Sequence, residues 1–415
     1  MSDRPTAISR RGLLGTVAAA GVAAPVLAAC GAPSSPGSSN TASSSASAAP
    51  TIADSPSAPA TINILDVAGN LALTQPAIEA FAAAHPKIVA NVTYTTGTAP
   101  DLAGKIQAEQ QAGNVQTSLV LTGTDGLADG IQQNLWQDVE AYYGQFFPNL
   151  MANYQPAAAS MATLAQNKGI ELVWYPSGPL IEYNPATVKT APDTTAALLA
   201  WAKANPGKFQ YAEPRNSGPG RTLLMGLPYL LGDKEPTNPT TGWAKTWNYL
   251  AQLNDYVSSY PSGTSATMKN IAAGTVDIIA STTGWYINGR AIGTVPKPIA
   301  VAKFKTFTWV TDAQYGVIPK GVSSDVLIAN LRLLAWLLTP EQQAVTYDQG
   351  YFYPGPAVKN VPLSKAPAAS RTCIAEYGVS AFAGWMTQYP MKNSLPAPAQ
   401  VTAFDLWDTK IGSTK

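Results

Sequence analysis

The stretch of chain from residue 61 to residue 134 alternates between strand-like and helix-like patterns, and this constrains the fold more than any other feature. Three runs have the alternating or β-branched pattern of strands, at residues 61–69, 88–94 and 117–123. Each is followed by a helix-like segment, at residues 74–85, 101–113 and 124–134. Strands that alternate with helices in this way predict a parallel α/β sheet.

The loops that follow these strands are the first candidates for a binding site. Ligands of open α/β sheets sit beyond the carboxyl ends of the strands. Asn70 follows the first strand, and Thr124 and Asp125 follow the third. We therefore expect these three residues at a site.

The middle of the chain continues with both kinds of element. Residues 170–188 form two extended runs that are broken between Pro176 and Pro179, and a helix is expected over 194–205. Further strands are expected over 208–214 and over 315–321. Segment 274–289 is expected to start with a strand and to end in a loop. An apolar helix over 323–338 ends before Thr339, which with Pro340 and Gln342 has the pattern of a capping box that starts another helix.

The N-terminus has the pattern of an export signal. Arg10 and Arg11 precede an uncharged apolar stretch over residues 13–27, which is too short to span a membrane. The paired arginines favour the export route for folded proteins. The sequence LAAC resembles a bacterial lipobox, which predicts that residues 1–30 form a twin-arginine lipoprotein signal peptide and that lipid attaches to Cys30.

Composition divides the rest of the chain. Residues 31–60 are almost entirely Ser, Ala, Pro, Thr and Gly, which predicts a disordered tether. Residues 61–415 exceed the size at which one core stops growing, so two lobes are expected. With Cys30 lipidated, Cys373 has no partner and is interpreted as a small buried apolar residue.

Several classes of chemistry are disfavoured. His85 is the only histidine in the sequence, which argues against histidine-containing metal sites and against a serine triad. No Walker lysine motif is present. The net charge of +1, without a concentrated basic run, argues against nucleic acid as a partner. Paired-carboxylate chemistry stays open, because such pairs form in space rather than in sequence. Since acidic residues are scarce, we expect no catalytic activity, no metal and no cofactor.

Four short stretches, taken together, resemble a known family. They are LLAWAKANPGKFQYAEP at 198–214, IEYNPATV at 181–188, the strand, Pro-Lys-Gly turn and helix of 315–344, and GYFYPGP at 350–356. With the lipoprotein signal and the polar tether, they resemble the bacterial extracellular solute-binding proteins of ABC importers.

The resemblance implies a two-lobed α/β fold of the type II periplasmic-binding-protein kind. Each lobe is expected to hold a mixed, mainly parallel sheet with flanking helices, and hinge strands join the lobes. The first lobe would comprise residues 61–175 plus 306–350, and the second 176–305 plus 351–415. The chain would cross between them near Tyr175, Lys305 and Gly350.

The resemblance also implies a function. A monomer, lipid-anchored through Cys30 to the outer face of the cytoplasmic membrane, would capture a small polar ligand between its lobes and deliver it to ABC permease subunits. The alternative is a lipid-anchored enzyme or accessory module on the same fold.

Residues at strand ends in both lobes are the candidate ligand contacts. They are Asn70, Thr124, Asp125, Tyr175, Asn216, Ser217, Gly218, Arg221, Trp285, Tyr286 and Tyr315. Aromatic rings beside a carboxylate suit either a sugar or polyol, or an organic cation such as a polyamine or a thiamine-like compound. Arg221 and the amides of Ser217 and Gly218 favour an anionic group instead.

Each aromatic or charged candidate also has a purely structural interpretation. Trp285 and Tyr286 would then be core residues, and Tyr175 would pack at a hinge. Asp125 would cap the helix that follows it, and Arg221 would cover a helix surface. Trp201 and Trp336 lie in apolar helical runs and are assigned to the core.

Overall fold

The computed structural model describes residues 52–415. The predicted signal peptide, the lipidation site at Cys30 and the tether up to residue 51 lie outside the described residues. Within residues 52–415, no helix combines the length and apolar character that a membrane crossing requires.

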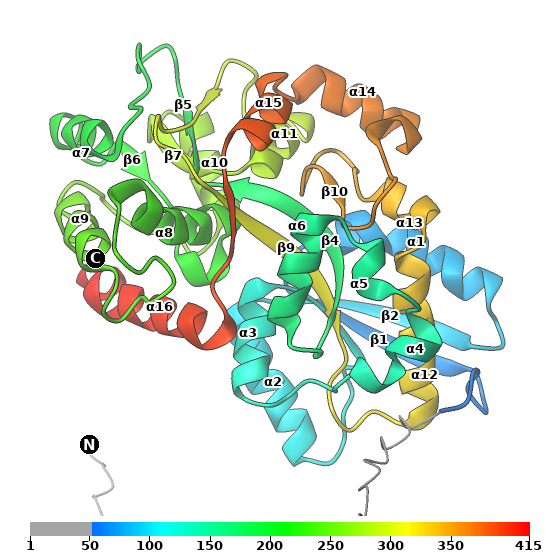
Figure 1. The fold of residues 1–415 in the computed structure, drawn as a ribbon. Coiled ribbons are helices and arrows are strands. Elements are labelled where there is room, and N and C mark those ends of the chain that lie inside the picture. Colours follow the sequence, from blue (N-terminus) through cyan, green and yellow to red (C-terminus); the bar gives the residue numbers. More distant parts are fainter. Residues whose placement is uncertain (1–51) are drawn as a thin grey trace, which may run out of the picture. The chain divides into compact units, whose positions relative to one another are not determined.

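A seven-stranded mixed sheet forms the centre of the first lobe (Figure 1). Its order is β10 (Gly355–Pro356), β4 (Ile170–Gly178), β9 (Trp309–Val317), β3 (Leu119–Gly123), β1 (Ala60–Asp66) and β2 (Val89–Thr96), and β11 (Met391–Asn393) pairs with β9. Strands β1, β2 and β3 are parallel, whereas β9 runs antiparallel to both β3 and β4. The predicted parallel unit at the start of the chain is therefore confirmed.

The helices around this sheet include the five that were predicted and three short ones between residues 143 and 162 that were not. They are α1 (Leu71–Ala84), α2 (Ala99–Gln111), α3 (Thr124–Gln132), α4 (Tyr143–Phe146), α5 (Leu150–Asn153), α6 (Pro156–Ala162), α12 (Ser324–Leu337) and α13 (Pro340–Val345), with the short 3₁₀ turns η1 (Glu140–Tyr142) and η2 (Thr163–Ala165). Helix α1 begins three residues before its predicted start, because the Leu71 N–H donates to Asp66 Oδ2 at 2.8 Å. Helix α13 starts after Thr339 as predicted, but no capping bond forms from the Thr339 side chain.

A four-stranded sheet forms the centre of the second lobe. Its order is β6 (Phe209–Gln210), β7 (Ile278–Ser281), β5 (Leu180–Tyr183) and β8 (Ala300–Ala302). Strands β6 and β7 are parallel, whereas β5 is antiparallel to both of its neighbours. This antiparallel pairing of β5 differs from the mainly parallel sheet expected for each lobe.

Helices surround this second sheet. They are α7 (Thr195–Ala204), α8 (Gly218–Leu231), α9 (Ala244–Asn254), α10 (Thr264–Ala272), α11 (Thr283–Ala291), α15 (Ala381–Gln388) and α16 (Ala397–Lys410), with η3 (Pro214–Asn216) and η5 (Gly412–Thr414). Helix α14 (Ala368–Tyr377) contacts α11 but buries Ile374 in the first core, and η4 (Leu363–Lys365) also packs on the first core. Helix α11 occupies a segment that was expected to be a loop. The Thr282 side chain accepts the N–H of Trp285 at 3.2 Å and so caps the start of this helix.

The apolar cores place part of the C-terminal region in an unexpected lobe. Ala357, Val358 and Val361 are buried in the same core as the strands of the first sheet. Strand β10 also pairs with β4. The chain therefore stays with the first lobe beyond Gly350, where a crossing was expected, because these apolar side chains complete the first core.

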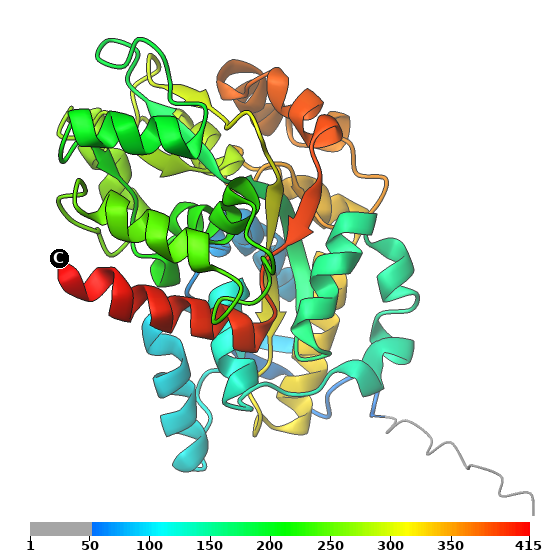
Figure 2. The same ribbon diagram turned by 60° about the vertical axis from the view of Figure 1, so that its left-hand side comes forward.

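Helix α16 belongs to the core of the second lobe but also packs against α3 of the first (Figures 1 and 2). Its Phe404 and Trp407 are buried with the second core, and Trp407 Nε1 donates to Tyr211 Oη at 3.0 Å. The red helix in Figure 2 runs below the green helices of the second lobe. The last helix thus contacts both lobes.

The first described residues lie on the first lobe. The Ser57 N–H and hydroxyl both donate to Asp325 at 2.7 Å, and Gln145 Nε2 donates to the carbonyl of Ile52 at 2.9 Å. Residues 52–60 therefore make specific contacts, although the predicted tether extends to residue 60. Cys373, expected to be buried, is a free thiol of intermediate exposure on α14.

Candidate functional site

A cavity of about 430 Å³ lies between the two lobes. The first lobe contributes residues that follow β1, residues at and just after the end of β3, one residue each from within β4 and β9, and the pair Tyr351 and Phe352. The second lobe contributes residues at the starts of α8, α10 and α11, with Lys269 further along α10. The lining residues of the cavity are Val67, Ala68, Gly123, Asp125, Tyr175, Asn216, Ser217, Gly218, Arg221, Ser262, Gly263, Thr264, Ser265, Ala266, Lys269, Trp285, Gln314, Tyr351 and Phe352. Seven of the eleven predicted site residues are among them. This volume accommodates a small organic molecule.

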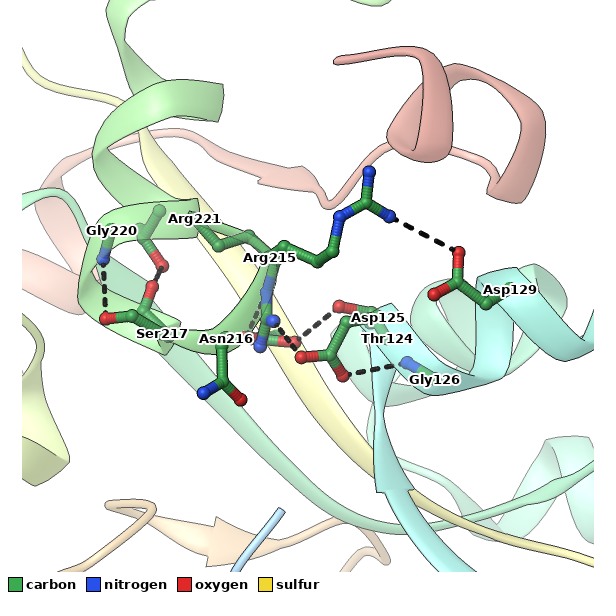
Figure 3. A network of polar contacts seen from close by, with 12 residues as sticks. Thr124, Asp125, Gly126, Asp129, Arg215, Asn216, Ser217, Gly220 and Arg221 are labelled. Carbon is green, nitrogen blue, oxygen red and sulfur yellow. Dashed lines mark hydrogen bonds and ion pairs between the residues drawn. The ribbon is translucent and has the colours of Figure 1, made fainter. Parts of the chain in front are cut away.

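Arg221 joins the lobes through two carboxylates (Figure 3). Its Nη1 lies 2.6 Å from Asp125 Oδ2, and its Nη2 and Nε lie 2.7 and 3.2 Å from Asp312 Oδ2. All three side chains are almost fully buried. Although burial opposes the positive charge, Asp125 and Asp312 raise the pKa of Arg221 above its ordinary value. The arginine therefore stays charged and holds α8 against α3 and β9.

The pairing of Arg221 changes its predicted role. The sequence suggested that Arg221 either binds an anionic group or covers a helix surface. Instead, two carboxylates occupy its hydrogen-bond donors, and the three groups together carry a net charge of −1. An additional anion at Arg221 would therefore face Asp125 and Asp312 at close range.

A second arginine makes a parallel set of contacts one turn along α3. Arg215 lies 3.8 Å from Asp129, and it pairs with Asp405 at 2.6 Å and with Asp408 at 3.3 Å on α16 (Figure 3 draws the Arg215–Asp129 pair). Burial raises the pKa of Asp129 from 3.8 to about 6, because it outweighs the attraction of Arg215. Ionised Asp129 is thus a cost to the folded protein near neutral pH.

We expect Asp129→Asn to be more stable than the parent protein at pH 8 and equally stable near pH 4. The folded state holds the Asp129 proton more tightly than the unfolded state does, so the stability from protonation is complete below about pH 4 and is lost as pH rises through about 6. Asparagine remains neutral throughout this range. Thermal unfolding between pH 4 and 8 measures the difference.

Asp405→Asn is the matched control, because Asp405 also pairs with Arg215 but its side chain is 64% exposed. We expect little change in the unfolding temperature for this variant at any of these pH values. A lower unfolding temperature of Asp129→Asn at pH 8 would contradict the assignment.

Trp285 and Tyr286 point in different directions because they lie on a helix. Consecutive helical residues are about 100° apart around the axis. Trp285 lines the cavity, where its ring meets that of Tyr351 edge-on with centroids 5.0 Å apart. Tyr286 packs outside the cavity, with the Arg290 guanidinium 3.5 Å from its ring centroid and Phe382 alongside. The placement of Tyr286 in the site is therefore not supported.

Tyr315 lies on the wrong face of its strand for a ligand contact. Successive side chains of a strand point to opposite faces. The Tyr315 side chain is fully buried in the first core, where its hydroxyl donates to the carbonyl of Met161 at 3.0 Å. Its neighbour Gln314 lines the cavity instead. The sequence prediction thus selected the adjacent residue.

Asn70 and Thr124 are close to the site but do not line the cavity. Asn70 Oδ1 accepts the Thr74 hydroxyl at 2.8 Å within the first turn of α1. The Thr124 hydroxyl donates to Asp312 Oδ1 at 3.0 Å. Asn70 Oδ1 and the Thr124 hydroxyl therefore bond within the protein and position the elements around the cavity, whereas the buried Asn70 Nδ2 has no hydrogen-bond partner among the described residues. Asp125, by contrast, lines the cavity and also accepts the N–H of Gly126 at 2.9 Å.

Tyr175 lines the cavity and also packs within the first lobe. Its ring stacks on that of Phe352 with centroids 4.9 Å apart. Both rings are buried in the first core. The side chain therefore packs on its own lobe and also faces the cavity, where its ligand contact stays a prediction.

Asn216, Ser217 and Gly218 lie in the cavity wall at the start of α8. The Ser217 hydroxyl accepts the N–H of Gly220 at 3.1 Å and shares a 2.7 Å hydrogen bond with the Thr264 hydroxyl. Asn216 Nδ2 donates to the carbonyl of Ser262 at 2.7 Å. These bonds fix the start of α8 against the start of α10.

Several cavity residues were not predicted from the sequence. The most polar of them are Gln314, Lys269 and the segment 262–266. A Ser- and Gly-containing turn before a helix was a usable signal for residues 262–266. For Gln314, the signal was the alternation of β9, which required the correct start of that strand at Trp309.

Solved structures of periplasmic binding proteins share this fold. P5PA is 17% identical with a TM-score of 0.60, and the match covers 85% of this chain and 99% of that chain. A putative spermidine/putrescine ABC transporter from Listeria monocytogenes is 14% identical with a TM-score of 0.59, covering 84% and 98%. AfuA from Actinobacillus pleuropneumoniae, with fructose-6-phosphate bound, is 15% identical with a TM-score of 0.60, covering 85% and 98%.

At this identity the similarity establishes the fold, and it confirms the expected type of two-lobed α/β architecture. No curated protein sequence matches the chain. Residues 76–372 match a family model that is described as bacterial extracellular solute-binding protein. Because this match spans well over half of the chain, the protein belongs to the family of bacterial extracellular solute-binding proteins.

Proposed function

We propose that the protein captures a small polar solute in the cavity between its lobes and delivers it to the permease of an ABC importer. The observation that carries the proposal is the composition of this cavity, in which polar side chains from both lobes surround one tryptophan. A solute that contacts both lobes stabilises the closed arrangement over an open one. Proteins with this fold include a GABA receptor and the fructose-6-phosphate complex of AfuA, which supports a small polar ligand.

We also propose that the protein is exported through its twin-arginine signal and held at the outer face of the cytoplasmic membrane by lipid on Cys30. The LAAC sequence supports this assignment. Replacing Cys30 with serine should release the protein from the membrane fraction into the soluble fraction. Retention of this variant in membranes would contradict the lipid anchor.

A solute screen tests the binding function. We expect one class among sugars, polyols, polyamines, thiamine-like cations, amino acids and sugar phosphates to raise the unfolding temperature and to change tryptophan fluorescence, since a ligand that binds only the folded state stabilises it. At one hundred times its Kd, a ligand adds about 2.7 kcal/mol to the stability. The absence of any response across all these classes would count against a solute receptor.

The same screen separates the receptor from an enzyme on this fold. A receptor releases its bound solute chemically unchanged when the protein is denatured. Mass spectrometry of the released solute measures this directly. Conversion of the solute during incubation would favour the enzyme.

A further inference from the structure

One end of the cavity carries a set of groups that the interlobe ion pairs do not use. Residues 262–266 and Lys269 line the cavity at the start of α10. The residue before this helix is Gly263, and no side chain caps the helix there. The N–H groups at the start of an α-helix have no partner within the helix and attract anions.

The other three helices that contribute their first turns to the cavity carry side-chain acceptors there. Ser217 caps α8 by accepting the N–H of Gly220, and Thr282 caps α11 by accepting the N–H of Trp285. Helix α3 carries Asp125 in its first turn, and this carboxylate accepts the N–H of Gly126. The start of α10 differs from these three because it has neither a side-chain cap nor an acidic residue in its first turn.

Lys269 adds a positive charge on the same wall of the cavity. It follows Ser265 by four residues, so the two side chains lie on one face of α10. Within residues 52–415, no carboxylate forms an ion pair with Lys269, as is also true of many other lysines of the chain. Arg221 is bound to two carboxylates, which leaves Lys269 as the available cation of the lining.

The opposite wall contains a buried polar group that lacks a partner. Gln314 is only 2% exposed, and its Nε2 donates to the Tyr175 hydroxyl at 3.3 Å. Its Oε1 has no hydrogen-bond partner among the described residues, although the side chain lines the cavity. A buried acceptor without a partner is costly, so a ligand that donates a hydrogen bond to Gln314 would remove this cost.

The two walls of the cavity match different chemical groups of a ligand. The α10 wall offers donors and a cation, and the β9 wall offers the Gln314 acceptor beside the carboxylate of Asp125. Asp125, Asp312, Arg221 and Lys269 together carry no net charge. A ligand with a positive charge alone would leave the α10 wall unmatched, and a sugar without a charge would leave Lys269 unused.

We propose that the solute is a small organic oxyanion that also carries a hydroxyl or amino group. Its carboxylate or phosphate binds the start of α10 and Lys269, and its hydroxyl or amino group donates to Gln314 and Asp125. This inference rests on the proposed solute-binding function and narrows it to one chemical class.

Matched solutes on shared carbon skeletons test the class. One set is glucose, gluconate and glucose 6-phosphate, and the other is butane-1,4-diamine and 4-aminobutanoate. Titration calorimetry with the purified protein should detect binding of an oxyanion member of at least one set, and weaker or no binding of its uncharged or cationic counterpart. Gluconate and glucose 6-phosphate distinguish carboxylate from phosphate.

Lys269→Gln should lower the affinity for the tightest-binding oxyanion by about tenfold or more, since a charge-assisted hydrogen bond of this kind contributes about 1.5–3 kcal/mol. Lys203→Gln, on α7 and outside the interlobe cavity, is the matched control and should leave the affinity unchanged. Lys269 and Lys203 are both exposed, so neither substitution should disturb folding.

Gln314→Met tests the other wall with a side chain of similar length. This substitution should weaken binding of the same solute. The protein without solute loses no hydrogen bond at Oε1, because Gln314 Oε1 has no partner within the described part of the chain. If glucose or the diamine binds as tightly as its oxyanion counterpart, or if Lys269→Gln keeps full affinity, the inference is overturned and the solute-receptor function stands. If neither these solutes nor the wider screen produces binding, both fail.

Discussion

Arg221→Met should lower the unfolding temperature more than any other single substitution discussed above. It removes the cation between Asp125 and Asp312, and both carboxylates would then remain almost fully buried without their partner. Breaking a buried pair in this way costs about 3–5 kcal/mol. Thermal or urea unfolding at pH 7 measures the loss.

Arg332→Met is the control for the same change at the surface. Arg332 lies 3.6 Å from Asp54, and the two side chains are 37% and 76% exposed. Exposed pairs of this kind contribute about 0–1 kcal/mol. If Arg221→Met were no less stable than Arg332→Met, the buried network would not be holding the lobes together. Adding Asp312→Asn to Arg221→Met should recover part of the stability, because it removes one of the unpaired charges.

Trp285→Ala should produce the largest loss of solute affinity, about tenfold to a hundredfold. Its ring is the only tryptophan among the residues that line the interlobe cavity, and large aromatic side chains at the centre of a binding site often contribute 2 kcal/mol or more. The variant should also lose most of the fluorescence change on binding. Titration calorimetry and fluorescence with the same solute measure both effects.

Tyr286→Ala provides the matched control, because the adjacent residue of α11 packs on Arg290 outside the cavity. We expect its affinity to stay within about twofold of the parent protein, although its stability falls through lost aromatic packing. Equal losses of affinity in the two variants would indicate that α11 itself had shifted, and the role of Trp285 would need revision.

The fold was predictable where a continuous segment of the chain carried a clear apolar periodicity. The strands and helices between residues 61 and 134 follow the period of their apolar side chains, and the family follows from motifs spread over the chain. The position of residues 355–366 was not predictable in this way. Short apolar runs such as Ala357–Val358 fit either core, and only the three-dimensional packing decides between them.

The site was less predictable because side-chain direction depends on element boundaries. Taking the end of segment 274–289 as a loop made Trp285 and Tyr286 equivalent, whereas helix α11 directs them to different sides. Starting β9 at Tyr315 hid the alternation that directs Gln314 to the cavity.

The partners of Arg221 were not predictable from local sequence at all. Asp125 lies 96 positions away and Asp312 lies 91 positions away. No local pattern reports a contact over such separations, so the sequence could not decide between an anion-binding arginine and a surface arginine. The structure assigns it a third role, as a charged tie between the lobes.

The position of α16 has a consequence for any opening of the cavity. Phe404 and Trp407 hold this helix in the core of the second lobe, whereas its contact with α3 crosses to the first lobe. An opening motion that moves each lobe as a unit must therefore separate α16 from α3. The surface that these two helices bury against each other then becomes exposed, so their contact stabilises the closed arrangement in addition to the ion pairs of Arg221.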